Sequence, residues 1–274
     1  MWFPNGIETM GYQTLTYQCD GQVATIALNL PDKRNAISAQ MIADLLGALD
    51  QAEAERARVV ILTGSGKAFC AGMDLDELKG IAQQPLQKNL ENARRMSRLF
   101  YRLYSFPKPI IAAVNGAAIA GGCGIATLAD FTLAVPEARF GYTEVRIGFM
   151  PALVSVFLRR QVGEKHARDL LLSGRIFDSA EAFRLGLVTE VVPAESLMAR
   201  AREIAGVLLA ASPAAVARAK KFLLRFDAAA VHAELEAAAE ANAEIRSTHD
   251  FREGLAAFLE RRPPKWSGDD SLDE

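Results

Sequence analysis

Cysteine and histidine are scarce in this sequence, with three of each among 274 residues. Cys19, Cys70 and Cys123 lack the spacing of metal ligands and are too few to build a disulfide framework in a chain of this length. The histidines also lack ligand spacing and fall in segments with helical periodicity. We therefore expect reduced thiols, a cytoplasmic protein and no metal site.

An excess of charge of either sign is also missing. The chain has 31 Lys and Arg against 33 Asp and Glu, a formal net charge of -2. This balance creates no global field that would attract nucleic acid or an anionic membrane surface. We expect neither as a partner.

No uninterrupted apolar run is long enough to cross a membrane. The strongest candidate, residues 110–129, is broken by Asn115 and several glycines, and its first five residues suit a buried parallel strand. The first eleven residues contain Glu8 and no basic side chain. The sequence thus predicts neither a secretory signal nor a mitochondrial transit peptide.

Three common catalytic motifs are incomplete or absent. Residues 64–67 resemble a phosphate-binding loop, but Ala68 stands where that loop needs Ser or Thr. Gly122 and Gly124 lack the third glycine of a dinucleotide fingerprint, and no Gly-x-Ser-x-Gly elbow occurs. These absences argue against a P-loop NTPase, an NAD enzyme and an α/β-hydrolase.

The sequence does contain alternating strand and helix patterns, which predict an α/β fold with right-handed crossovers. A hairpin is expected at Asp20-Gly21 between β-rich runs at 14–17 and 23–28. Ser38 and Ser179 are predicted to cap helices. Further strands are expected at 59–63, 110–114, 131–135 and 188–192, and helices at 87–104, 152–161, 164–172, 179–185, 195–209, 213–226, 231–245 and 250–259.

Two small-residue turns, at 70–74 and 115–124, are the most informative segments. Each follows an apolar run and leads into an amphipathic segment, which is how a chain presents free backbone N–H groups at a helix N-terminus. A glycine turn alone more often serves tight packing. Two such turns that converge would stabilise a developing oxyanion.

These segments belong to a longer set of motifs, in which the sequence resembles the enoyl-CoA hydratase/isomerase (crotonase) superfamily over about residues 14–260. The resemblance implies a spiral of ββα units over 12–192 and a C-terminal helical region, 193–262, used in trimerisation, with flexible ends at 1–11 and 263–274. It implies an acyl-CoA thioester as ligand, no separate cofactor, and a homotrimer or a dimer of trimers. The motifs are residues 31–36, 66–74, 115–124, 140–148 and 174–182.

The same resemblance assigns site residues. It places the two oxyanion-binding amides at Met73 and Gly121 and the acid at Glu144. Lys33 and Arg34 stand where the family approaches the CoA phosphates, although solvated charges are an equal interpretation of such loop cations. The residues expected to bind substrate are Lys33, Arg34, Ala68, Ala71, Gly72 and Asp74.

Glu144 lies in an apolar segment that would raise its pKa by desolvation and fit it for proton transfer near neutrality. From the residues alone, an exposed acid at a helix start is an equal interpretation; the resemblance favours catalysis. Typical hydratases carry a second glutamate where this chain has Gly124. We therefore predict an enoyl-CoA hydratase with a single catalytic acid, and the resemblance extends to methylglutaconyl-type hydratases. A 3,2-enoyl-CoA isomerase and an acyl-CoA-binding protein with little catalysis are the alternatives.

Overall fold

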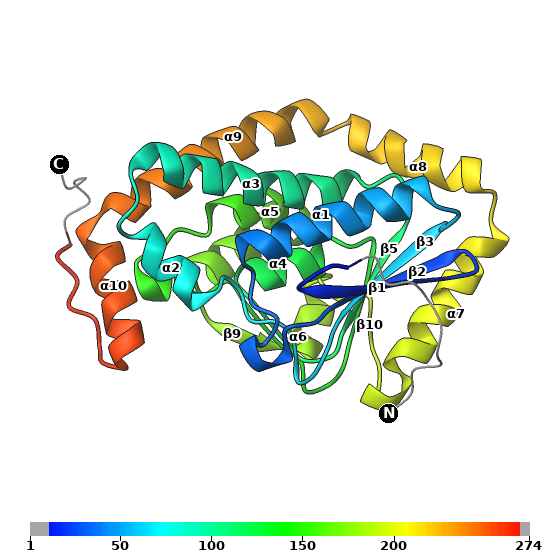
Figure 1. The fold of residues 1–274 in the computed structure, drawn as a ribbon, viewed down its shortest axis with the longest axis horizontal. Coiled ribbons are helices and arrows are strands. Elements are labelled where there is room, and N and C mark those ends of the chain that lie inside the picture. Colours follow the sequence, from blue (N-terminus) through cyan, green and yellow to red (C-terminus); the bar gives the residue numbers. More distant parts are fainter. Residues whose placement is uncertain (1–10, 269–274) are drawn as a thin grey trace.

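The computed structural model describes residues 11–268, which form two β-sheets surrounded by helices (Figure 1). The larger sheet has the strand order β1-β2-β3-β5-β7-β10. Strands β1 and β2 pair antiparallel around the predicted turn at Asp20-Gly21, and the other neighbours are parallel. These strands are β1 (Leu15–Asp20), β2 (Val23–Leu28), β3 (Val59–Gly64), β5 (Ile110–Val114), β7 (Phe131–Ala134) and β10 (Glu190–Val191).

The smaller sheet has four short strands in the order β4-β6-β8-β9. Strands β3, β5 and β7 of the larger sheet are each followed along the chain by one of its strands and then by helical structure. The predicted ββα repeat of a mixed α/β fold is therefore confirmed. The strands are β4 (Ala68–Cys70), β6 (Ala117–Ile119), β8 (Arg139–Gly141) and β9 (Ile176–Asp178).

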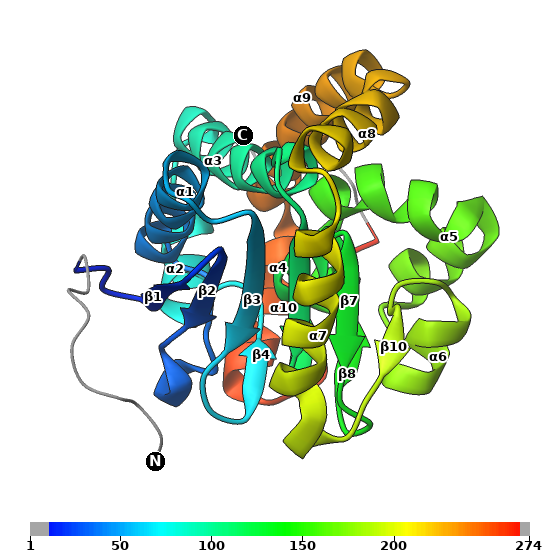
Figure 2. The ribbon, with the colours of Figure 1, turned by 90° about the vertical axis from the view of Figure 1, so that its right-hand side faces the viewer.

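Helices cover the sheets on several sides. Strand β5, whose five residues are all buried, contacts α4 and also α7, which runs across the larger sheet in Figure 2. Burial on both sides explains why this strand is a continuous apolar run. The helices are α1 (Ala39–Ala54), α2 (Leu75–Ile81), α3 (Leu86–Ser105), α4 (Gly121–Thr127), α5 (Ala152–Ser173), α6 (Ser179–Arg184), α7 (Leu197–Ala210), α8 (Pro213–Arg225), α9 (Ala228–Glu244) and α10 (His249–Glu260).

Of the two predicted helix caps, one is confirmed and one is wrong. The Ser38 hydroxyl accepts a hydrogen bond from the Met41 N–H at 3.1 Å, which confirms the predicted cap of α1. The predicted cap of α6 was wrong, because the Asp178 carboxylate accepts from the Glu181 N–H at 2.8 Å. Ser179 is instead the first helical residue. A carboxylate one position earlier reaches the free amides of the first turn.

The C-terminal region is helical, as expected, and part of it belongs to the core. The face of α9 with Val231, Leu235 and Asn242 is buried, and α9 packs on α3 and α5 of the same chain. This face is therefore covered by helices of the same chain. Within residues 11–268, no helix has both the length and the apolarity that crossing a membrane requires.

The C-terminal end of the described chain packs against α10. Residues 263–268 include Lys265, whose N–H donates to Glu253 at 2.7 Å, so the chain is held against α10 beyond Pro263. The rest of the expected flexible ends, 1–10 and 269–274, lies outside the described residues.

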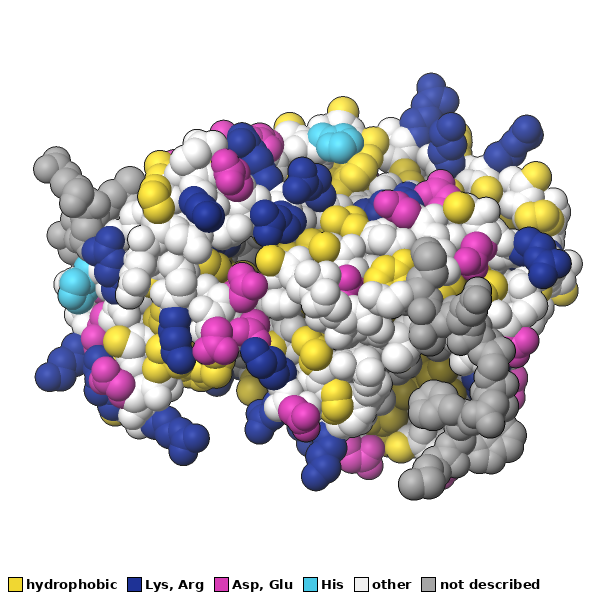
Figure 3. All heavy atoms as spheres, viewed as in Figure 1, with side chains coloured by type: hydrophobic (Ala, Val, Ile, Leu, Met, Phe, Trp, Pro, Cys, Tyr) yellow, Lys and Arg dark blue, Asp and Glu magenta, His cyan; other side chains and the backbone are white. Residues whose placement is uncertain are grey.

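Apolar side chains reach the surface around α8 (Figure 3). On α7 and α8, the large exposed ones are Val207, Phe222 and Leu223, with Phe226 at the end of α8.

Candidate active site

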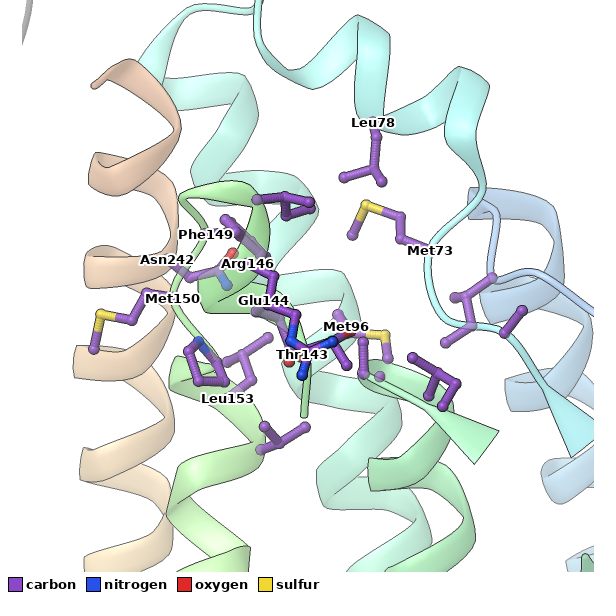
Figure 4. A pocket seen from close by; sticks show the side chains of 18 of the residues that line it. Met73, Leu78, Met96, Thr143, Glu144, Arg146, Phe149, Met150, Leu153 and Asn242 are labelled. Carbon is purple, nitrogen blue, oxygen red and sulfur yellow. The ribbon is translucent and has the colours of Figure 1, made fainter. Parts of the chain in front are cut away.

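A cavity of about 610 Å³ lies where the two glycine turns meet the C-terminal helices. Its wall is mainly apolar. In Figure 4, Met73 lies on one side of the cavity, Asn242 of α9 on the other, and Glu144 between them. A mostly apolar cavity with a few inward polar groups is the usual form of a small-molecule site.

Glu144 is the polar centre of this cavity. It begins a short 3-10 turn, Glu144–Ile147, and only 8% of the residue is exposed. Its Oε2 atom is buried and has no hydrogen-bond partner among the described residues. The turn ends at Gly148, whose φ of 66° and close approach to the Asp250 carbonyl leave no room for a side chain. The carboxylate is therefore carried by a backbone segment that is fixed against α10.

Burial changes the acidity of this group. Desolvation raises the pKa of Glu144 from 4.5 to about 7, and a backbone hydrogen bond opposes the change only in part. No other carboxylate lines the cavity in the described part of the chain. A single acid with a pKa near neutrality can both accept and return a proton.

The first glycine turn brings Met73 to the cavity. Its neighbours along the backbone are occupied: the Ala71 N–H donates to the Arg34 carbonyl and the Asp74 N–H to the Ile37 carbonyl. The Met73 N–H itself has no acceptor among the described residues. Asp74 accepts bonds from the first amides of α2, so the turn is fixed just after Met73.

The second glycine turn places Gly121 at the start of α4, also on the cavity wall. The first amides of a helix have no acceptor within it. Ala120, just before it, has a φ of 51°, which is uncommon for a residue with a side chain. Strained backbone of this kind points to a functional constraint. The structure thus brings the two turns to one cavity, each with an amide free to bind an anion.

The predicted substrate-binding residues divide into two groups. Arg34 and Ala71 line the cavity. Lys33 lies outside it and pairs with Asp74 at 3.0 Å, an ion pair that raises the pKa of the exposed lysine. The predicted residues that do not line the cavity are Lys33, Ala68, Gly72 and Asp74.

Beside Gly124, the wall is closed. A Cβ atom there would stand 2.8 Å from Val154 Cγ1 and 3.0 Å from Phe100 Cζ, and both of these side chains line the cavity. Apolar groups therefore fill the place next to the position where typical hydratases carry a second glutamate. A second water-binding carboxylate has no room there without movement of the wall.

Four polar residues of the wall were not predicted as site residues: Thr143, Arg146, Asn242 and Arg246. Asn242 lies on the buried face of α9, and Arg246 follows α9 in the 3-10 turn Ile245–Ser247. An arginine at the end of an alanine-rich helix suggests a solvated cation that complements the helix dipole. Nothing in the local pattern reveals that it is buried.

Comparisons with known proteins place the chain in a family. The enoyl-CoA hydratase/isomerase family matches residues 18–269. The chain belongs to this family. A Thermus thermophilus protein that bears the name enoyl-CoA hydratase is 44% identical over 247 residues, which cover 90% of this chain and 98% of that protein. The 2,3-dehydroadipyl-CoA hydratase of Escherichia coli is 34% identical, with 90% of this chain and 96% of that protein covered.

Solved structures of the enoyl-CoA hydratase/isomerase family show the same fold. An enoyl-CoA hydratase/isomerase from Xanthobacter autotrophicus Py2 superposes with a TM-score of 0.85 at 31% identity, covering 92% of this chain and 98% of its own. The chain is therefore an enzyme of a family that acts on acyl-CoA thioesters. The cavity that Glu144 lines is the candidate site for such chemistry.

Proposed function

We propose that this enzyme adds water reversibly to a 2-enoyl-CoA thioester, with Glu144 as its single catalytic acid and base. The observation that carries the proposal is that Glu144 is buried and unpaired in the cavity wall, between two turns whose amides are free. Lys33 and Arg34 would meet the CoA phosphates, with Ala68, Ala71, Gly72 and Asp74 shaping that end of the site.

The proposed reaction moves one proton through Glu144. Its carboxylate takes a proton from water, the oxygen bonds to C3, and the electron pair of the double bond moves through C2 onto the thioester oxygen. The N–H groups of Met73 and Gly121 hold that oxygen, and such a donor typically contributes roughly 3 kcal/mol. Glu144 then returns the proton to C2. Only water and a proton are exchanged, so the step needs no redox cofactor, and CoA enters as part of the substrate.

Water must be held without a second carboxylate. The Thr143 side chain lines the cavity next to Glu144 and makes no capping bond to the turn that follows. Its hydroxyl can both donate and accept a hydrogen bond, and it belongs to the residue next to Glu144 in the sequence. It could therefore hold the attacking water together with Glu144. This arrangement replaces the water clamp that two glutamates form in typical hydratases.

Double-bond migration between C2 and C4 is the second candidate. It needs one base and no water, and the apolar wall beside Gly124 favours it. The hydratase names of the relatives favour water addition.

Isotope labelling in H₂¹⁸O separates the two reactions. Crotonyl-CoA, a methylglutaconyl-type ester and a 3-enoyl-CoA are incubated with the enzyme, and the products are analysed by mass spectrometry. We expect ¹⁸O in a 3-hydroxyacyl product from a 2-enoyl ester. If only the 3-enoyl ester reacts and no product carries ¹⁸O, the enzyme is an isomerase. If no ester reacts but all bind, the chain is an acyl-CoA-binding protein.

A further inference from the structure

Arg246 is a buried cation in the wall of the active-site cavity. Only 2% of the residue is exposed. Its Nη2 atom donates to Asn242 Oδ1 at 2.6 Å, and its Nη1 atom donates to the Asn89 carbonyl at 3.3 Å and to Asn89 Oδ1 at 3.5 Å. All three acceptors are neutral. The Nε atom is buried and has no partner among the described residues.

No carboxylate of the described residues neutralises this charge. Within residues 11–268, Arg246 forms no ion pair, and burial alone lowers its pKa to about 10. The guanidinium is thus still protonated at neutral pH. A buried charge without a counter-charge is costly, and a perturbed group of this kind in a cavity is a candidate for ligand binding.

Comparison with other arginines shows that the environment of Arg246 is unusual. Arg34 and Arg146 also line the cavity, but both are exposed and remain in contact with water. Arg94 connects the same two helices, α3 and α9, outside the cavity wall, and it does so through a carboxylate, Glu236, at 2.9 Å. Arg246 alone among these is withdrawn from water without an acidic partner.

Asn242 adds a second donor at the same place. Its Oδ1 is used by Arg246, whereas its Nδ2 donates to no acceptor in the described chain. Asn242 and Arg246 both line the cavity, so together they present N–H groups without enough protein acceptors. Such a cluster suits an oxyanion that accepts several bonds at once.

The proposed function, on which this inference rests, determines which part of the substrate lies near Arg246 and Asn242. In Figure 4, Glu144 lies between Met73 and Asn242. A thioester whose oxygen is held at Met73 and whose C2 and C3 are near Glu144 would extend its acyl chain towards Asn242. The far end of the chain would then meet the buried guanidinium.

We propose that Arg246, assisted by Asn242, binds a carboxylate at the far end of the acyl chain, so that the preferred substrates are CoA esters of dicarboxylic enoic acids. A neutral acyl chain would leave the guanidinium unpaired in a drier cavity. A terminal carboxylate supplies the missing counter-charge. Charge-assisted bonds of this kind favour the charged substrate by about tenfold to a hundredfold.

A structural role for Arg246 makes a different prediction. The guanidinium carbon lies 5.5 Å from the centre of the Phe149 ring, and the side chain connects α9 to Asn89 of α3. If these contacts were its whole purpose, removal of Arg246 would weaken the reaction of charged and neutral substrates alike. The ratio between two substrates therefore separates the two roles.

The test compares two esters with the same number of acyl carbons: trans-2-hexenoyl-CoA, which ends in a methyl group, and 2,3-dehydroadipyl-CoA, which ends in a carboxylate. Hydration is followed by loss of the enoyl-thioester absorbance. We expect kcat/KM of the wild type to favour the carboxylate ester at least tenfold. Arg246→Met should lose at least tenfold more kcat/KM on that ester than on the hexenoyl ester.

Arg94→Met is the matched control, because it removes an arginine that connects the same helices outside the cavity. It should leave the substrate ratio unchanged. Equal kcat/KM of the wild type for the two esters, or equal losses in Arg246→Met, would overturn the inference. Should Arg246→Met fail to fold, titration of the wild type with adipyl-CoA and hexanoyl-CoA decides, since the saturated diacid ester should bind at least tenfold tighter.

Failure of the proposed function has a separate signature. If neither unsaturated ester gains water but adipyl-CoA still binds more tightly than hexanoyl-CoA, water addition is wrong and the carboxylate subsite stands. If both esters are hydrated without preference, water addition stands and the carboxylate subsite is wrong.

Discussion

At the scale of single residues, the burial of Glu144 affects both catalysis and stability. Apolar surroundings withhold water from its carboxylate, which raises its pKa to about 7 and leaves Oε2 without a partner. The same desolvation makes the group a better proton carrier near neutrality and a poor contributor to folding when it is charged. Activity and stability should therefore respond in opposite directions when this carboxyl is replaced.

Glu144→Gln tests the catalytic half of this argument. The amide keeps the size of the side chain but cannot carry a proton between water and C2. General acid–base catalysis typically contributes about 10²–10⁴-fold, and we expect kcat to fall by at least that lower value. Binding of a saturated acyl-CoA, measured by calorimetry, should change little. A loss of less than tenfold on the best substrate would remove Glu144 from the mechanism.

The pH dependence of activity tests the altered acidity. Water or a C2 proton can be deprotonated only by the ionised carboxylate, so kcat/KM should rise with pH and level off above a pKa of about 7. A profile that is already flat between pH 5 and 8 would show that the carboxyl keeps its ordinary acidity. Circular dichroism at each pH verifies that the enzyme remains folded.

The pH dependence of stability has the opposite sign. Below pH 4.5 the Glu144 carboxyl is neutral in both states, and its contribution to stability is complete. Between pH 4.5 and about 7 the unfolded chain releases the proton before the folded chain does, so folding loses stability as pH rises. In urea unfolding, the advantage of Glu144→Gln over the wild type should therefore grow between pH 5 and 8, by on the order of 2 kcal/mol. An advantage that shrinks over this range would contradict the assignment.

At the scale of elements, the sequence correctly predicted features that depend only on residues close together along the chain. The break between the helices predicted at 152–161 and 164–172 is found inside α5 at Gly163, where φ is 74°. The Ser38 cap and the strand at 110–114 were also located correctly. The α6 cap was missed because Asp178 and Ser179 both cap helices well, and only the tertiary contact of Ser179 Oγ with the Pro136 carbonyl decides between them.

Helix α4 gives an element-scale prediction. Alanine normally stabilises a helix relative to glycine, but at Gly124 its Cβ would press on Val154 and Phe100. We expect Gly124→Ala to lower the free energy of unfolding by about 1–3 kcal/mol, the usual cost of overpacking. Gly206→Ala in α7, where nothing lies within 4 Å of the added atom, should raise it by about 0.5–1 kcal/mol.

Urea denaturation of the two variants makes the comparison. If both gain stability equally, the wall beside Gly124 can yield, and a second carboxylate could be accommodated there. Packing of the wall would then not be what limits this enzyme to one acid.

At the scale of the whole molecule, the sequence indicated which turns carry the site but not everything that closes it. Met73, Gly121 and Glu144 lie in recognisable motifs, and all three line one cavity. Arg246 could not be found in this way. Its burial results from packing of α9 against α3, elements more than a hundred residues apart in the chain. No local pattern encodes that contact.

Self-association is the remaining whole-molecule property, and the surface of α8 suggests where it occurs. The buried face of α9 is used within the chain, whereas Phe222, Leu223 and Phe226 are 57%, 69% and 71% exposed. Contiguous apolar surface of this kind marks an interaction site. We expect light scattering at micromolar concentration to give the mass of a trimer or of a dimer of trimers.

Substitution should weaken that assembly in a position-dependent way. Phe222 and Phe226 pack edge to face with their ring centres 5.0 Å apart, so a charge at either place disturbs one shared patch. Phe222→Glu combined with Phe226→Glu should shift the mass towards the monomer, because burying two unpaired carboxylates is unfavourable. Leu172→Glu, at an equally exposed apolar position in α5, is the control and should leave the mass unchanged. A wild-type monomer would refute the prediction of an oligomer, and an intact oligomer in the double variant would place its interface elsewhere.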